Sequence, residues 1–151
     1  MSTLIRALSF LLVSFASSVA LAGPAEDALA TVDRWSAAYT ANDVDAIVSL
    51  YTPDAILLGT VSPVMSEGTE AIRTYFSGVK GTGNTNTIGD KRVILLDDSA
   101  VLVTGFYVFS NARQEQPTPR PSRFTMLVTK RNGEWKIAHH HSSPRVQPTP
   151  K

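Results

Sequence analysis

The sequence contains no cysteine and only three histidines among its 151 residues. The absence of cysteine excludes disulfide bonds, thiol chemistry and metal sites with sulfur ligands. Charge of either sign is not in excess, since 14 Lys and Arg stand against 13 Asp and Glu. A nearly neutral chain without a basic stripe gives no electrostatic reason to expect nucleic acid or an anionic membrane as a partner.

The first 22 residues differ in composition from the rest of the chain. They combine a short basic start, an apolar run and the sequence Ala20-Leu21-Ala22, which has the A-x-A form of a cleavage site. This pattern predicts a secretory signal peptide over residues 1–22 and a periplasmic or secreted protein, with an uncleaved anchor as the alternative. No later run reaches the roughly 20 apolar residues of a membrane-spanning helix, so we expect no membrane contact after cleavage.

The remaining chain predicts one domain over residues 23–144 and a flexible tail over residues 145–151. Apolar residues at three- and four-residue steps predict helices, and β-branched and aromatic runs predict strands. Helices are expected over residues 24–41, 42–52 and about 69–79, and strands over residues 55–60, 87–96, 100–110, 123–130 and 134–142. Helices followed by long strands with short antiparallel connections indicate an α+β fold in which a curved sheet wraps its helices.

All three histidines lie in one stretch, "WKIAHHHSS", which has the composition of a strand. Because side chains alternate along a strand, His139 and His141 share a face with the apolar Ile137. We therefore expect His139 and His141 to face the core and line the deep end of a pocket. The same alternation places His140 on the opposite face, toward solvent or another subunit.

Three roles are open for His139 and His141. As a metal site they supply two ligands, and a third must come from Asp or Glu. As an acid–base site one imidazole needs a partner that orients it. The available partners are Asp54, Tyr39, Tyr51 and Tyr75. The third role, and the commonest for histidines in an apolar strand, is a hydrogen-bonded support of the pocket or of a subunit contact. We expect neither a metal nor a cofactor.

Arg123 begins the strand that pairs with the histidine strand through the hairpin sequence Arg131-Asn132-Gly133. It should therefore lie near the histidines, where it binds an anionic group or forms an ion pair at the edge of the sheet. Aromatic residues are numerous enough to line an apolar cavity, or simply to fill the core. They are Trp35, Tyr39, Tyr51, Tyr75, Phe76, Phe106 and Tyr107.

Three motifs carry a resemblance to a known family. They are "W-x-x-A-Y" from Trp35, "D-x-D-A-I-V-S-L-Y-x-x-D-A" from Asp43, and "K-R-N-G-E-W-K-I-A-H-H-H-S-S" from Lys130. Together they resemble the SnoaL-like branch of the nuclear transport factor 2-like superfamily. The ending "G-x-W-x-x-x-H-x-H-x-S" is similar to the association domain of calcium/calmodulin-dependent protein kinase II and its stand-alone bacterial relatives. Its positions here are Gly133, Trp135, His139, His141 and Ser143.

The resemblance implies a cone-shaped barrel, in which a strongly curved antiparallel sheet wraps about three N-terminal helices around a deep pocket. It also implies a homodimer or higher oligomer built on sheet-to-sheet contacts. An outer sheet face carrying Phe124, Met126 and Val128 would support such contacts.

The function expected from these features is an exported homo-oligomeric module that binds a small, partly apolar or anionic ligand and has no kinase activity. Trp35, Tyr39 and Tyr75 would form the pocket walls. His139 and His141 would be its polar contacts, and Arg123 the partner of an anion. The alternative is a small SnoaL-like enzyme, such as an isomerase, cyclase, dehydratase or oxidoreductase, that uses His139 or His141 as general acid or base without a cofactor.

Overall fold

The computed structural model describes residues 23–146. The predicted signal peptide and the last five residues of the predicted tail lie outside this range. The helices are α1 (Pro24–Ala41), α2 (Val44–Ser49) and α3 (Gly68–Ser77). The strands are β1 (Tyr51–Leu58), β2 (Met65–Glu67), β3 (Asn84–Asp97), β4 (Ala100–Asn111), β5 (Arg120–Arg131) and β6 (Glu134–Pro144). None of the helices in the described range is long and apolar enough to cross a membrane.

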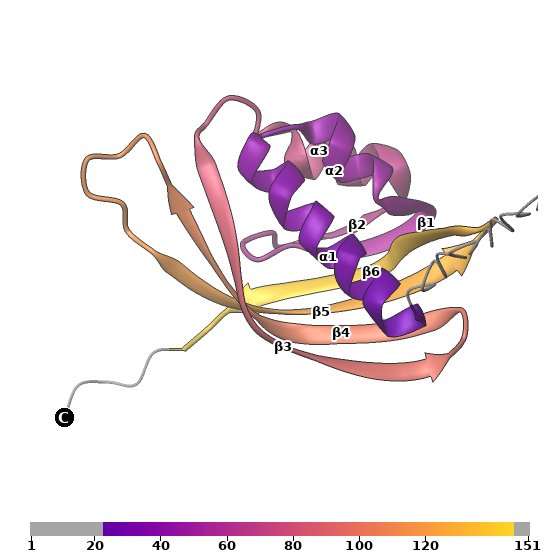
Figure 1. Ribbon diagram of the computed structural model, residues 1–151. Coiled ribbons are helices and arrows are strands. Elements are labelled where there is room, and N and C mark those ends of the chain that lie inside the picture. Colours follow the sequence, from indigo (N-terminus) through magenta and orange to yellow (C-terminus); the bar gives the residue numbers. More distant parts are fainter. Residues whose placement is uncertain (1–22, 147–151) are drawn as a thin grey trace, which may run out of the picture.

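The strands form one six-stranded sheet in the order β2-β1-β6-β5-β4-β3. Figure 1 shows the helices gathered on one side of this sheet, with the long strands β3 to β6 curving around α1. The predicted α+β class with a curved sheet around N-terminal helices is confirmed. The sheet is mixed rather than purely antiparallel, because β1 runs parallel to β6.

Helix α1 forms where the sequence predicts it. Pro24 stands in its first turn, where its missing N–H costs nothing, and acidic residues follow it. The stripe of Val32, Trp35 and Tyr39 is buried against the sheet. Asn42 ends the helix with φ of 57°, a left-handed conformation that Asn tolerates.

The boundaries of the next elements differ from the predicted ones. The helix predicted over residues 42–52 is shorter in the structure, and its N-cap is Asp43, whose carboxylate accepts a hydrogen bond from the backbone N–H of Ala46 at 2.9 Å. β1 starts at Tyr51, before the proline expected to separate helix from strand, because Tyr51 already pairs with Ile137 of β6. Sheet pairing thus overrides the local helical pattern. The short β2 was not predicted.

The side chains of β5 point the opposite way from the expectation. Phe124, Met126 and Val128 are fully buried against the helices, so the prediction that they lie on the outer face is wrong. Their outward neighbours include Thr125 and Leu127, which are half-buried. The other alternating set, Arg123, Thr125, Leu127 and Thr129, is the more polar one and lies on the outer face.

Candidate ligand pocket

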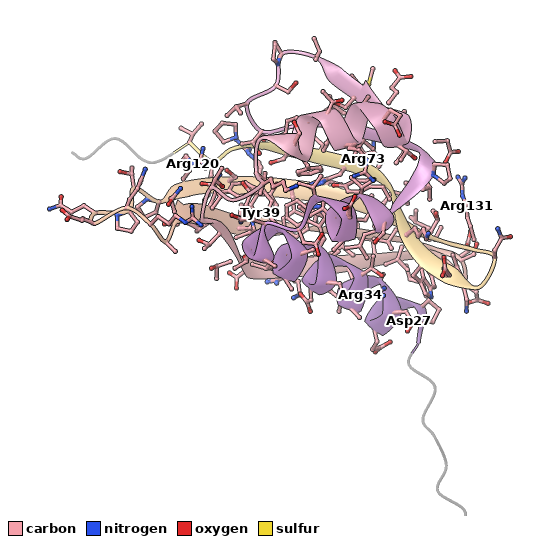
Figure 2. All side chains as sticks on the ribbon, turned by 90° about the horizontal axis from the view of Figure 1, so that it is seen from above. Asp27, Arg34, Tyr39, Arg73, Arg120 and Arg131 are labelled. Carbon is pink, nitrogen blue, oxygen red and sulfur yellow. The ribbon has the colours of Figure 1, made fainter. Side chains whose placement is uncertain are left out.

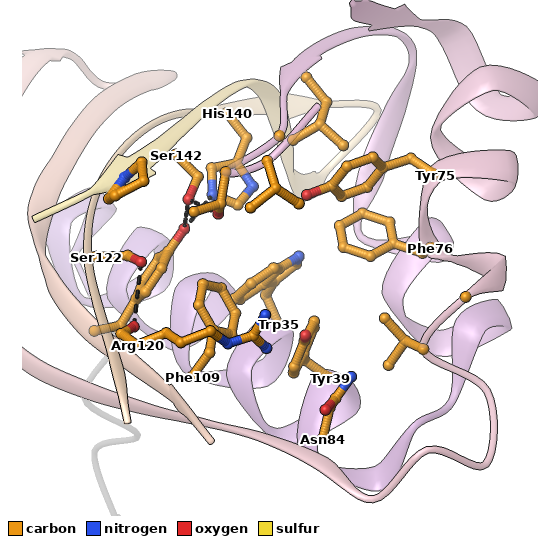
Figure 3. Close-up of a pocket in the computed structure, with 18 of the residues that line it drawn as sticks. Trp35, Tyr39, Tyr75, Phe76, Asn84, Phe109, Arg120, Ser122, His140 and Ser142 are labelled. Carbon is orange, nitrogen blue, oxygen red and sulfur yellow. Dashed lines mark hydrogen bonds between the residues drawn. The ribbon is translucent and has the colours of Figure 1, made fainter. Parts of the chain in front are cut away.

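A cavity of about 430 Å³ opens between α1, α3 and the concave face of the sheet. Its walls are largely apolar and aromatic, and Figure 3 shows the rings arranged around it. The aromatic lining residues are Trp35, Tyr39, Tyr75, Phe76, Tyr107 and Phe109. Its size and lining are those of a small-molecule site.

The histidine that reaches this cavity is His140, and the predicted inward placement of His139 and His141 is wrong. Val128 of β5 pairs with Ile137, while the adjacent Leu127 pairs with His139. One extra residue, Ala138, therefore stands in β6 as a β-bulge and shifts the alternation by one position. His140 is 1% exposed, whereas His141 is exposed on the outer face.

His140 sits between two tyrosine hydroxyls. The Tyr51 hydroxyl lies 2.8 Å from Nδ1 of the ring, and the Tyr107 hydroxyl lies 3.4 Å from Nε2. Burial lowers the pKa of His140 to about 3, with a smaller contribution from His139 and His141, so the ring is neutral at neutral pH. A neutral imidazole donates from one nitrogen and accepts at the other.

The hydroxyl chain decides which nitrogen of His140 carries the proton. Tyr107 donates its own O–H to Ser142 Oγ, so toward His140 it can only accept. The hydrogen therefore lies on Nε2, and the Tyr51 hydroxyl donates to Nδ1. Beyond Ser142 the chain continues to the hydroxyl of Thr60, at the wall of the cavity.

The inner end of the pocket is polar and uncharged. Burial raises the pKa of both the Tyr51 and the Tyr107 hydroxyl, so these groups keep their protons. With His140 also neutral, this end presents hydrogen-bonding groups and no formal charge. An ionised group of a ligand would gain nothing there to offset the loss of its hydration.

Among the residues 23–146 that the structure describes, Arg120 is the one charged residue that lines the cavity. Figure 3 shows its guanidinium directed into the cavity on the side of Trp35 and Tyr39, and it lies 6.0 Å from the ring centroid of Phe109. No ion pair found within residues 23–146 involves Arg120. Figure 2 shows Arg120 on the opposite side of the molecule from Asp27, near the start of α1, with Tyr39 between them.

The charge of Arg120 acts on the tyrosines beside it. Burial raises the pKa of Tyr39 and of Tyr75, and the positive charge of Arg120 partly opposes this rise in both. Arg120 therefore provides the positive potential of the pocket, and an anionic group placed there would find a cation without a competing carboxylate.

Of the other predicted pocket residues, Trp35, Tyr39 and Tyr75 line the cavity, whereas Arg123 does not. Arg123 is exposed on the outer face, where it shares a shallow groove with His141. Because three positions separate Arg120 from Arg123 on one strand, they project to opposite faces. The predicted strand starts at residue 123, after Arg120, whereas β5 starts at Arg120 itself.

The part of the chain that the structure describes contains no set of side chains that could coordinate a metal ion. No group of three or more His, Asp or Glu side chains gathers there closely enough to hold an ion. In particular, His139 and His141 lie on the outer face of the sheet without a carboxylate forming a third ligand.

Comparison with known proteins agrees with this architecture. The model of the SnoaL-like domain matches residues 28–147. The chain belongs to the SnoaL-like domain family. No curated protein sequence matches it.

Solved structures similar to this chain include a kinase association domain, a candidate association domain and candidate dehydratases. A candidate calcium/calmodulin-dependent protein kinase II association domain from Xanthomonas campestris is 31% identical, with a TM-score of 0.74 over 89% of this chain and 98% of that one. The association domain of the C. elegans kinase is 20% identical, with a TM-score of 0.65 over 76% and 91%. A candidate dehydratase of the NTF2-like family from Streptomyces avermitilis is 15% identical, with a TM-score of 0.72 over 82% and 96%. The fold of this SnoaL-like protein is therefore the nuclear transport factor 2-like fold.

Proposed function

We propose that this SnoaL-like protein is an exported, self-associating module that binds a small, largely apolar monoanion. The observation that carries the proposal is the composition of the pocket. One cation, Arg120, stands among aromatic walls, and the polar groups at the inner end are neutral. A ligand with an apolar body and a single carboxylate or comparable anionic group fits this distribution.

The test uses 2-naphthoate as an aromatic monocarboxylate and 2-naphthamide as its neutral counterpart, with binding measured by isothermal titration calorimetry. Arg120→Ala should weaken 2-naphthoate binding about tenfold, because a charge-assisted hydrogen bond is lost. Binding of the amide should be nearly unchanged. Arg123→Ala is the matched control, since it removes the same group from the same strand outside the pocket. Absence of binding to the unmodified protein, or equal effects of the two substitutions, contradicts the proposal.

An enzyme that moves a proton with the pocket histidine is the second candidate. The observation in its favour is the position of His140 between the hydroxyls of Tyr51 and Tyr107. Its weakness is the lowered pKa, because an imidazole with a pKa of about 3 is a poor base at neutral pH. Turnover of a carbonyl-containing substrate that is lost in His140→Gln would favour the enzyme over the binding module.

Self-association is supported by an apolar row across the outer sheet face. Ile94 pairs with Leu102, and Leu102 with Leu127. Leu127 in turn pairs with His139. Ile94 is 52% exposed, and the row crosses β3 to β6 without interruption. A second copy of the sheet packed on this row would bury it and place His139 in the contact.

Sedimentation velocity at micromolar concentration tests this part of the proposal. The unmodified protein should sediment as a dimer or larger, and Ile94→Lys should shift it toward monomer. Val64→Lys is the matched control, since it changes an apolar residue that is 66% exposed in a loop away from this face. A monomeric unmodified protein contradicts self-association.

Export is the part of the proposal that rests on the sequence of residues 1–22, which lie outside the described residues. The pattern predicts cleavage after Ala22. Amino-terminal sequencing of the protein from its own cells should give Gly23 as the first residue. Recovery of an intact Met1 from a cytoplasmic fraction contradicts export.

A further inference from the structure

One wall of the pocket depends on a contact that no side chain other than hydrogen permits. Gly59 follows β1 and begins a turn in which its carbonyl accepts a hydrogen bond from Ser62 N–H at 3.2 Å. A Cβ atom added at Gly59 would overlap the far end of the Tyr75 ring, including its hydroxyl. Tyr75 comes from α3, so this contact joins the helix layer to the sheet at the cavity.

The hydroxyl end of Tyr75 lies at the cavity, close to Thr60. Figure 3 shows the hydroxyl of Tyr75 pointing into the cavity. Interaction with Thr60 lowers the pKa of that hydroxyl, although burial raises it more. Thr60 is also the last member of the hydroxyl chain that starts at His140. Tyr75 is half-buried, with one edge against Phe76 at a centroid distance of 4.9 Å.

We propose that Tyr75, held in place by Gly59, is the residue that sets the upper size limit of the ligand. The ring rests directly on the backbone of Gly59, so it closes the cavity as far as the strand allows. A methyl group at position 59 would displace the hydroxyl end of the ring from Thr60 and change the shape of this wall. Gly59 is then a positioning residue that acts through Tyr75. The inference rests on the proposed binding function.

The chain offers a matched control for this glycine. Gly89 of β3 is not among the residues that line the cavity, and a Cβ atom added there would meet its nearest atom, the carbonyl oxygen of Phe106, at 3.6 Å. This is an ordinary van der Waals contact, and Gly89 has no positive φ. Gly59 has no positive φ either, so its backbone conformation accepts alanine. The atoms that a methyl group would overlap belong to the movable end of the Tyr75 side chain. Both Gly→Ala variants should therefore fold.

The experiment compares the Kd of benzoate with that of 2-naphthoate, by calorimetry, in four variants. Gly59→Ala should change the ratio of the two Kd values by about threefold or more. Gly89→Ala should leave the ratio unchanged. Tyr75→Ala removes the wall and should favour 2-naphthoate. In the Tyr75→Ala background, Gly59→Ala should have no further effect, because the residue through which it acts is gone.

The outcomes separate this inference from the proposed function. If neither probe binds the unmodified protein, the proposed function fails. If both probes bind and Arg120→Ala weakens their binding, but Gly59→Ala and Gly89→Ala give the same ratio, the function stands and the role of Tyr75 is wrong. An effect of Gly59→Ala that persists without Tyr75 also overturns the proposal, because the glycine then acts by another route.

Discussion

Acid should destabilise this protein through His140. The pKa of the ring falls from an ordinary 6.5 to about 3 in the folded state, because the buried ring cannot be hydrated when charged. The unfolded chain therefore binds more protons between these two pH values. The stabilisation from the neutral ring is complete above pH 6.5 and is lost as the pH falls toward 3.

The size of the effect follows from the shift. A difference of this size corresponds to about 5 kcal/mol at the acid limit, as one pKa unit is worth about 1.4 kcal/mol. At pH 5, where the unfolded state is protonated and the folded state is not, the loss is about 2 kcal/mol. His140 is almost completely buried, so solvent screening does not reduce this figure greatly.

Urea denaturation between pH 7 and 4.5, at one protein concentration, measures the loss. His140→Gln replaces the imidazole with a polar amide that does not titrate. The unfolding free energy of this variant should therefore decline less steeply with acid than that of the unmodified protein. Asp54 and Asp97, whose pKa values are lowered, contribute equally to both proteins and cancel in the difference. His141→Gln is the control on the outer face. Parallel curves for the unmodified protein and His140→Gln would refute the reasoning.

A direct titration complements the denaturation series and does not depend on a variant. The ring carbon resonances of His140 should stay constant in NMR spectra of the folded protein from pH 7 to 4.5, whereas the histidine resonances of the urea-unfolded protein should move over the same range. Titration of His140 near its ordinary pKa would show that water reaches the ring.

Two further predictions concern stability, and both are measured by urea denaturation at pH 7. Phe124→Ala should cost about 3–5 kcal/mol because it leaves a cavity in the core, whereas Phe106→Ala, on the outer face at 38% exposure, should cost far less in the monomer; equal losses would contradict the assignment of faces. Asp27→Ala should cost about 1–2 kcal/mol by removing the acceptor of the Trp135 indole N–H, 3.0 Å away. Glu26→Ala, in the same turn but exposed, is its control, and equal losses would mean that only the charge at the helix start matters.

Local periodicity in the sequence was sufficient to predict the order of the helices and the long strands. The steps of three and four residues through Val32, Trp35 and Tyr39 predict α1 because burial of one face is a local pattern. The hairpin joining β5 to β6 follows from Asn132 and Gly133, which take positive φ as such a turn requires. Both features involve interactions between residues near each other in the chain.

The polar residues of the pocket were not predicted correctly, because their placement depends on strand pairing. The bulge at Ala138 has no signature in "WKIAHHHSS", because it arises where β6 must fit between a parallel and an antiparallel neighbour. That single extra residue exchanges His139 and His141 for His140. Arg120 was missed because it lies before the strand predicted over residues 123–130, although its backbone pairs with Phe109 in the sheet.

The sequence by itself determined the family, the α+β fold and the aromatic walls, since these depend on composition and on short-range spacing. Trp35, Tyr39 and Tyr75 lie in the cavity where the helical stripes and the family predicted them. Only the tertiary structure decided which strand residues face it. The period of a strand is two, so a shift of one residue turns every following side chain to the other face. Such a shift is set by strand partners far away in the sequence, and it brought His140 into the pocket while His139 and His141 stayed outside.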